Sequence, residues 1–163
     1  MAHHVPRADR PTDKAARYAE IAEEIAAVLE GEPNRVARMA TIASMLHDAM
    51  PAFFWTGFYL KDGDEELVVG PYQGTLGCLR IRFGHGVCGT AAAERKTQIV
   101  ADVDAFPGHI ACDSRSKSEI VAPVIDKTGE LIGVFDVDST ELAAFDSIDA
   151  TWLDRILSDA FSR

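Results

Sequence analysis

The sequence predicts an α+β domain in which helices pack on a central antiparallel sheet. Apolar residues recur at spacings of three and four near both ends of the chain, which is typical of amphipathic helices. Between these ends, short runs of aromatic and β-branched residues alternate with glycine-containing turns, which is typical of hairpins. The 163 residues, 47 % of them hydrophobic, fit one core. We therefore expect a flexible N-terminus at residues 1–11 and a single domain over residues 12–163.

Two helices are expected at the start of this domain. Thr12 and Asp13 can cap the first one, and Gly31 ends it. The second helix is expected to begin at Pro33, a position where the missing N–H of proline costs little, and to end before Pro51.

The middle of the chain changes to strand patterns. Residues 53–60 and 66–72 form a predicted hairpin, in which Pro71 indicates an edge or a bulge. Trp55 and Tyr59 share one face of its first strand. Because both faces of that strand carry aromatic side chains, one face can line a pocket. The alternative, that this face packs beneath the N-terminal helices, explains the aromatic residues equally well.

A glycine-rich segment follows an extended stretch at residues 76–83. It spans residues 84–89 and precedes a short helix expected at residues 90–96. Glycine-rich turns can cradle phosphates, but the lysine of a P-loop and the full dinucleotide spacing are missing. Close backbone packing explains these glycines as well. A short strand at residues 97–101 and a long loop ending at Ser118 are expected next.

The last elements are a second hairpin and a C-terminal helix. Its strands are expected at residues 119–126 and 130–138, with glycine in the turn. Asp146 or Ser147 can cap the final helix. Its buried stripe is expected to consist of Ile148, Trp152, Ile156, Leu157 and Phe161.

An acidic cluster is the most unusual feature of this hairpin. Asp136 and Asp138 are two residues apart in a strand, so both point to one face. If Lys127 pairs with Glu130, Glu119 lies opposite Asp138, whereas a shift of one residue would separate them. Opposed carboxylates destabilise a sheet unless a cation or a shared proton offsets their repulsion, so the cluster suggests a ligand site. The alternative is a solvated strand end.

The chain has three cysteines, which are Cys78, Cys88 and Cys112. An odd number argues against a structural disulfide framework, and the spacings lack the close pairs of a zinc site, so no metal is expected. Simple burial is the commonest state of a free cysteine and stays open for each. Cys112 lies in the long polar loop, where His109, Arg115 and Lys117 would favour its thiolate.

Charge and hydropathy narrow the possible partners. A formal net charge of -10 argues against nucleic acid and against an anionic membrane surface. The sequence has no apolar run long enough to span a bilayer and no signal-peptide pattern at its start. We therefore expect a cytoplasmic protein.

Five segments carry a resemblance to a known family, and they are Trp55-Thr-Gly-Phe-Tyr59, Gly86-Val-Cys-Gly-Thr90, Gly108-His-Ile-Ala-Cys-Asp113, Ser118-Glu-Ile-Val121 and Asp136-Val-Asp-Ser-Thr140. Over about residues 40–160 the chain resembles the free methionine-(R)-sulfoxide reductases, a catalytic branch of the GAF-domain family. All three cysteines and the acidic strand match, which a generic GAF domain would not require. The turn at residues 127–129 looks one residue longer than in some relatives.

The resemblance implies a GAF-like catalytic domain that reduces free L-methionine-(R)-sulfoxide to methionine. Cys112 would be the nucleophile and would become a sulfenic acid, which Cys78 would resolve as a disulfide. Thioredoxin would reduce that disulfide, so no bound cofactor or metal is needed. Cys88 matches a third family cysteine of less certain role. Members of the family are commonly dimeric, so a homodimer is expected.

The resemblance also implies a substrate pocket. Trp55 and Tyr59 match pocket residues of the family. Glu119 and Asp138 are candidates for the acid that protonates the sulfoxide oxygen, because clustered carboxyls can hold a proton at neutral pH. Asp136 could bind the ammonium group of the free amino acid.

Two other functions fit parts of the sequence. A GAF domain can sense a small ligand without turnover, because the fold alone does not imply catalysis. A thiol-based peroxide sensor could use Cys112 and Cys78 and would show no stereoselectivity for sulfoxides. Nothing in the spacing of the cysteines separates this last reading from the enzyme.

Overall fold

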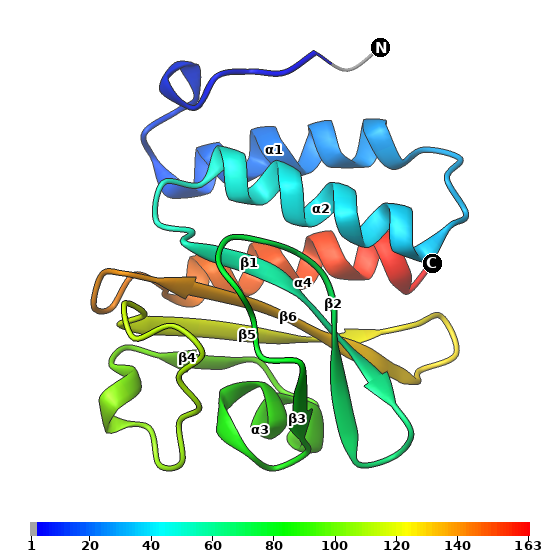
Figure 1. Ribbon diagram of the computed structural model, residues 1–163. Coiled ribbons are helices and arrows are strands. Elements are labelled where there is room, and N and C mark those ends of the chain that lie inside the picture. Colours follow the sequence, from blue (N-terminus) through cyan, green and yellow to red (C-terminus); the bar gives the residue numbers. More distant parts are fainter. Residues whose placement is uncertain (1–2) are drawn as a thin grey trace.

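The protein has three layers built around one curved sheet. The computed structural model describes residues 3–163, and Figure 1 shows α1, α2 and α4 on one side of the sheet and α3 on the other. The helices are α1 (Lys14–Leu29), α2 (Arg35–Ala49), α3 (Gly86–Glu94) and α4 (Ser147–Phe161). The strands are β1 (Trp55–Asp62), β2 (Glu66–Gln73), β3 (Arg80–Arg82), β4 (Gln98–Val100), β5 (Ser118–Ile125) and β6 (Leu131–Ser139). Two short 3₁₀ helices, Arg7–Asp9 and Val103–Ala105, complete the described elements.

All six strands are antiparallel neighbours in the order β3-β2-β1-β6-β5-β4. This confirms the predicted α+β fold with a central antiparallel sheet. Alternate residues of β1, β5 and β6 enter two separate apolar clusters. Phe58, Phe135 and Val137 face the three long helices, whereas Tyr59 and Val134 face α3 and the loops beside it. The sheet therefore separates a core on one face from a second cluster on the other.

The N-terminal helices begin and end at capping residues. The side chain of Asp13 accepts a hydrogen bond of 3.0 Å from the backbone N–H of Ala16, as expected. The second helix begins later than predicted, because Asn34, not Pro33, provides the cap through the N–H of Ala37. Both caps satisfy donors that the first helical turn cannot pair internally.

The β1–β2 hairpin contains the irregularity that Pro71 indicated. Gly57 pairs with Tyr72, but Tyr59 pairs with Val69, so one strand has an extra residue at this point. β3 pairs with β2 only as far as Val68, which leaves the stretch around Pro71 without a β3 partner. Proline is tolerated there because no ladder bond from its nitrogen is needed.

The β5–β6 pairing brings Glu119 opposite Asp138, as predicted. The N–H of Asp126 donates to the carbonyl of Glu130, so the turn consists of residues 127–129, and the pairing of Lys127 with Glu130 that was assumed for this register does not form. A one-residue shift between Val124 and Ile125 compensates for this difference. The predicted pairing of the carboxylates was therefore right, although the turn that led to it was not.

Two helical predictions need correction. Residues 86–89 were expected in a turn, but they form the first turn of α3. A Cβ at Gly89 would overlap the carbonyl oxygen of Arg82, so close backbone packing requires glycine there. In α4, Asp146 caps the helix through a capping box with Asp149, and Ile148 is 39 % exposed rather than buried. Leu153, which the predicted stripe omitted, is fully buried.

Two arginines of the N-terminal segment contact the helical layer. Arg7 donates to the backbone carbonyls of His47 and Asp48 at 2.8 and 2.7 Å, and buried Arg10 bonds Glu20 and Glu24. Residues 1 and 2 of the segment expected to be flexible lie outside the described residues. None of the helices in residues 3–163 has the length and apolar character that a membrane crossing needs.

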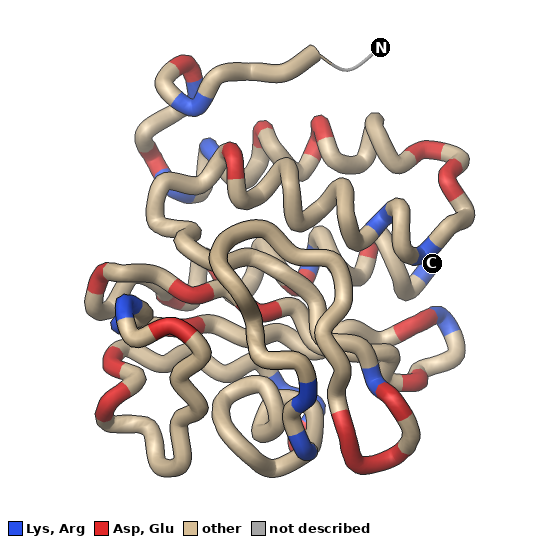
Figure 2. The backbone as a smooth tube through the Cα atoms, in the orientation of Figure 1, with Lys and Arg blue, Asp and Glu red and all other residues tan. Residues whose placement is uncertain are grey.

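Acidic and basic residues are scattered along the chain. Figure 2 shows Lys and Arg singly or in pairs among more numerous Asp and Glu, in keeping with the formal net charge of -10.

Candidate functional site

A pocket of about 520 Å³, counted with its mouth, lies on the α3 side of the sheet. Its floor comes from β1, β5 and β6, and one wall comes from the first turn of α3. The other walls come from the loop before β3 and from the loop that precedes β5. The loop before β5 is the long loop that the sequence predicted, whereas residues 76–79, which were expected to be extended, lie before β3 begins at Arg80.

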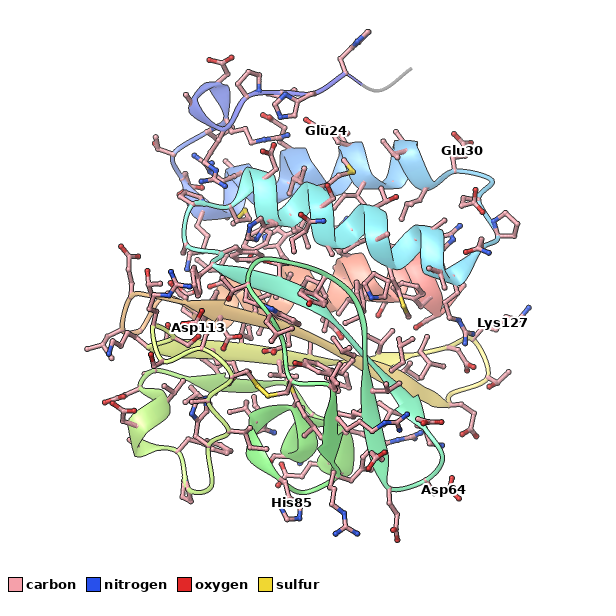
Figure 3. The ribbon with its side chains drawn as sticks, in the orientation of Figure 1. Glu24, Glu30, Asp64, His85, Asp113 and Lys127 are labelled. Carbon is pink, nitrogen blue, oxygen red and sulfur yellow. A yellow bond between two sulfur atoms is a disulfide. The ribbon has the colours of Figure 1, made fainter. Side chains whose placement is uncertain are left out.

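A disulfide between Cys78 and Cys112 joins the two loops across the mouth of the pocket. Their Cα atoms are 5.6 Å apart although the residues are 34 positions apart in the chain. Figure 3 draws the bond in yellow, on the α3 side of the sheet. Thr75 reinforces the same junction, because its hydroxyl donates to a carboxylate oxygen of Asp113 at 2.8 Å. The pocket therefore lies beneath a closed pair of loops.

Trp55 and Tyr59, on the β1 part of the floor, belong to a stack of aromatic rings. The ring of Trp55 stacks on Tyr59 at 5.6 Å and on Tyr72 at 5.0 Å between centroids. Its indole N–H donates to the backbone carbonyl of Thr75 at 2.8 Å, which fixes the ring's orientation. Gly57 makes this stack possible, since a Cβ there would overlap Tyr72.

The floor carries three carboxyl side chains, and a thiol lies against them. Glu119 and Asp136 are each 5 % exposed, and Cys88 is 3 % exposed. One ligand atom from each of these three residues lies within 4.8 Å of the other two, and the Cys88 thiol points to Glu119 at 4.0 Å. Asp138 lies opposite Glu119 in the sheet and lines the same pocket. Asp136 Oδ1 is buried without a hydrogen-bond partner among the described residues.

Burial and crowding hold these groups in their protonated forms. Burial, with help from Asp138, raises the pKa of Glu119 to about 8. Burial also raises the pKa of Asp136 and of Asp138 well above the usual range, and the carboxyl neighbours add to both shifts. The pKa of the Cys88 thiol is raised for the same two reasons. The site can thus hold protons at neutral pH, while the thiol of Cys88 is poorly suited to act as a nucleophile.

Cys88, Glu119 and Asp136 have the donor types of a small metal site. The raised pKa values mean that a cation would have to displace protons from all three groups. The same three groups could instead store protons or bind a small cationic group of a ligand.

The polar residues around Cys112 take different positions. His109 lies in the pocket with its Nε2 3.5 Å from Glu119 Oε1, and burial lowers its pKa. Arg115 instead pairs with Asp113 at 2.8 Å, and that pairing lowers the pKa of Asp113. Of the three cationic residues predicted to surround Cys112, only His109 lines the pocket.

The structure brings the predicted site residues together. Trp55, Tyr59, Cys88, Cys112, Glu119, Asp136 and Asp138 line the pocket, and Cys78 is bonded to Cys112. Sequence reasoning missed Gly77 and Asp113. A Cβ at Gly77 would lie 2.8 Å from the ring of Trp55, and glycine beside a cysteine was the only signal available for it. Asp113 lines the pocket, and its position next to Cys112 in the sequence could have indicated this.

A model of the GAF domain matches residues 37–160, which is most of the chain. The chain belongs to the GAF family. Within that family its relatives include the free methionine-R-sulfoxide reductase of Escherichia coli, which is 40 % identical over 90 % of this chain and 87 % of that protein. The GAF domain-containing protein A of Dictyostelium discoideum is 51 % identical over 88 % of this chain and 90 % of its own length.

A solved structure shows that the likeness extends to the three-dimensional fold. The free methionine-R-sulfoxide reductase from Neisseria meningitidis, in complex with its substrate, is 45 % identical and has a TM-score of 0.91, covering 98 % of this chain and 93 % of that one. These comparisons confirm that the resemblance seen in the sequence is to the reductase branch of the GAF domains.

Proposed function

We propose that this protein reduces free L-methionine-(R)-sulfoxide to L-methionine. The observation that carries the proposal is the Cys78–Cys112 disulfide at the mouth of a pocket with a protonated carboxyl floor. Redox-active cysteines can accept the sulfoxide oxygen, and protonated carboxyls can supply the proton that the oxygen needs. The named relatives support the same substrate.

In the proposed reaction, the thiolate of Cys112 attacks the sulfoxide sulfur. The oxygen passes to Cys112, methionine leaves, and the cysteine is left as a sulfenic acid. The thiol of Cys78 then attacks this sulfur, water leaves, and the disulfide forms. Cys112 is assigned the first step because it is exposed at the pocket, whereas Cys88 is buried with a raised pKa.

The carboxyl floor has two proposed roles. Glu119 and Asp138 share a proton that they deliver to the sulfoxide oxygen; their close pairing makes the titration a property of both. Asp136 binds the ammonium group of the substrate, because its buried Oδ1 has no partner and a cationic donor would satisfy it. The rings of Trp55 and Tyr59 contact the S-methyl end.

Thioredoxin is proposed to reduce the disulfide after each turnover. The reduction supplies two electrons and two protons and needs no bound cofactor or metal. The proposal also includes a homodimer in the cytoplasm, which size measurements of the purified protein and cell fractionation would test.

The test is thioredoxin-coupled oxidation of NADPH with the free (R) sulfoxide, its (S) epimer and an N-acetylated analogue. We expect turnover on the free (R) amino acid alone, since the ammonium group and one face of the sulfur must be recognised. Absence of turnover on every sulfoxide, with a working thioredoxin system, would overturn the proposal. Binding of the sulfoxide without turnover would then favour the sensing function.

A further inference from the structure

Exposed apolar residues lie close in the chain to both cysteines of the disulfide. Cys112 is exposed and Cys78 is partly buried. Leu76 and Leu79, on either side of Cys78 in the chain, are 77 % and 70 % exposed. Ile110, two residues before Cys112, is 42 % exposed. We call Leu76, Leu79 and Ile110 the disulfide rim.

Each member of the disulfide rim lies next to a part of the disulfide site. Leu76 and Ile110 line the same pocket as Cys112. Leu79 directly follows Cys78, so their Cα atoms are about 3.8 Å apart. Its carbonyl accepts a hydrogen bond of 2.9 Å from the N–H of Val69, which ties this part of the loop to β2. The backbone of Leu79 is therefore held in place beside Cys78.

Exposed apolar side chains around a reactive group indicate an interaction surface. We infer that the disulfide rim is the docking surface of a protein dithiol of the thioredoxin type, which reduces the Cys78–Cys112 bond. This inference rests on the proposed function, because the reaction forms this disulfide in every cycle. A dithiol protein can bury the two leucines, whereas a small charged thiol such as glutathione gains little from contact with them.

The reduction balances without any further reactant. A thiolate of the partner bonds to one sulfur of the Cys78–Cys112 pair, the bond between them breaks, and the other cysteine leaves as a thiolate. The partner's second thiolate attacks the mixed disulfide and frees the first cysteine. The partner ends as a disulfide, and the two cysteines of this chain take up two protons.

Leu79 is the residue to change, because it belongs to the rim but does not line the pocket. We expect Leu79→Ser to raise the Michaelis constant for thioredoxin roughly tenfold, since burial of a leucine contributes about that factor to binding. Activity with dithiothreitol as the reductant should not change. Leu79→Met should restore most of the affinity, because it returns an apolar side chain of similar size.

Val36→Ser is the matched control. Val36 is 58 % exposed, but it lies on α2, on the opposite side of the sheet. It should leave the Michaelis constant for thioredoxin unchanged. If Leu79→Ser and Val36→Ser give the same constant as the unchanged protein, the rim is not the docking surface.

A second measurement keeps this inference separate from the proposed function. Reduction of the preformed Cys78–Cys112 disulfide by thioredoxin can be followed by thiol titration without any sulfoxide. A slower reduction in Leu79→Ser alone supports the docking surface even if no sulfoxide is turned over. Equal rates in all variants, or faster reduction by glutathione than by thioredoxin, would overturn it.

Discussion

The two faces of the sheet are built from the same strands but have different chemistry. β6 sends Phe135 and Val137 towards the three long helices, where both are fully buried among apolar side chains. It sends Asp136 and Asp138 to the other face, where carboxyls with raised pKa values line a pocket. The helix face gains stability from burial, whereas the pocket face keeps polar groups that are costly to bury.

Substitutions on the two faces should therefore have different effects on stability and activity. Asp136 holds an unpartnered buried oxygen, which is a cost that the fold tolerates at a functional site. Phe135, one residue earlier in the chain, lies 4.8 Å from the ring of Phe58 and has no polar atom in its side chain. The helix face should therefore determine stability, and the pocket face should determine activity.

The strongest test of this division is Cys112→Ser. We expect it to lower turnover of the (R) sulfoxide by at least about a thousandfold, because a hydroxyl cannot accept the oxygen and pass through a sulfenic acid. Its stability should match that of the unchanged protein under reducing conditions. A coupled NADPH assay and denaturant unfolding provide both values. Turnover near the original rate would assign the nucleophile to another cysteine.

Phe135→Ala should have the opposite effect. Removing a buried ring from the helix face should lower the free energy of unfolding by about 3–5 kcal/mol. Urea unfolding followed by tryptophan fluorescence measures this loss. The Michaelis constant of the fraction that remains folded should stay the same. A loss below about 1 kcal/mol would mean that the helix face does not determine stability.

The protonated floor makes stability depend on pH. The folded pKa of Glu119, about 8, lies above its ordinary value, so the folded state binds more protons than the unfolded state between these values. The stability that Glu119 contributes is fully present at pH values below the ordinary pKa of glutamate. It is lost as the pH rises through about 8. At about 1.36 kcal/mol for each pKa unit, we expect the free energy of unfolding to fall by about 5 kcal/mol over that range.

Glu119→Gln is the control for this pH effect. It should remove most of the decline in the free energy of unfolding, because glutamine does not titrate in this range. Unfolding titrations at several pH values give the slope directly. An unchanged slope in Glu119→Gln would place the relevant proton on Asp136 or Asp138 instead.

The smallest expected effect belongs to Asp136→Asn. It should raise the Michaelis constant for the sulfoxide about tenfold, because a charged hydrogen bond to the ammonium group is lost. The turnover number should change less, and stability should not fall. Steady-state kinetics separate the two constants. A larger loss in turnover than in the Michaelis constant would remove Asp136 from the binding role.

The sequence predicted the sheet well because alternation is a local signal. The positions of Trp55 and Tyr59 on one face, and of Asp136 and Asp138 on one face, follow from the period of a strand alone. The predicted start of α3 was wrong because residues 86–89, which include two glycines, have the composition of a turn. Gly89 lies in this helix because the carbonyl of Arg82 leaves no room for a side chain there. The sequence does not reveal that contact.

The site was predicted by resemblance more than by pattern. Cys78 and Cys112 are 34 positions apart, and no local signal in the sequence joins them. The pairing of Glu119 with Asp138 was right although the assumed turn was wrong, since the shift near Ile125 offsets the longer turn. Long-range contacts of this kind depend on the packing of several elements, which a periodic pattern does not encode.

The most direct test of the proposed chemistry is a single turnover in Cys78→Ser. Without its resolving partner, Cys112 should release one methionine per protein from the free (R) sulfoxide and remain as a sulfenic acid that dimedone traps. Peptide mass spectrometry would locate the trapped group at Cys112, and the (S) epimer should give neither product. Release of no methionine, or a trapped group at Cys88 instead, would contradict the proposed reaction.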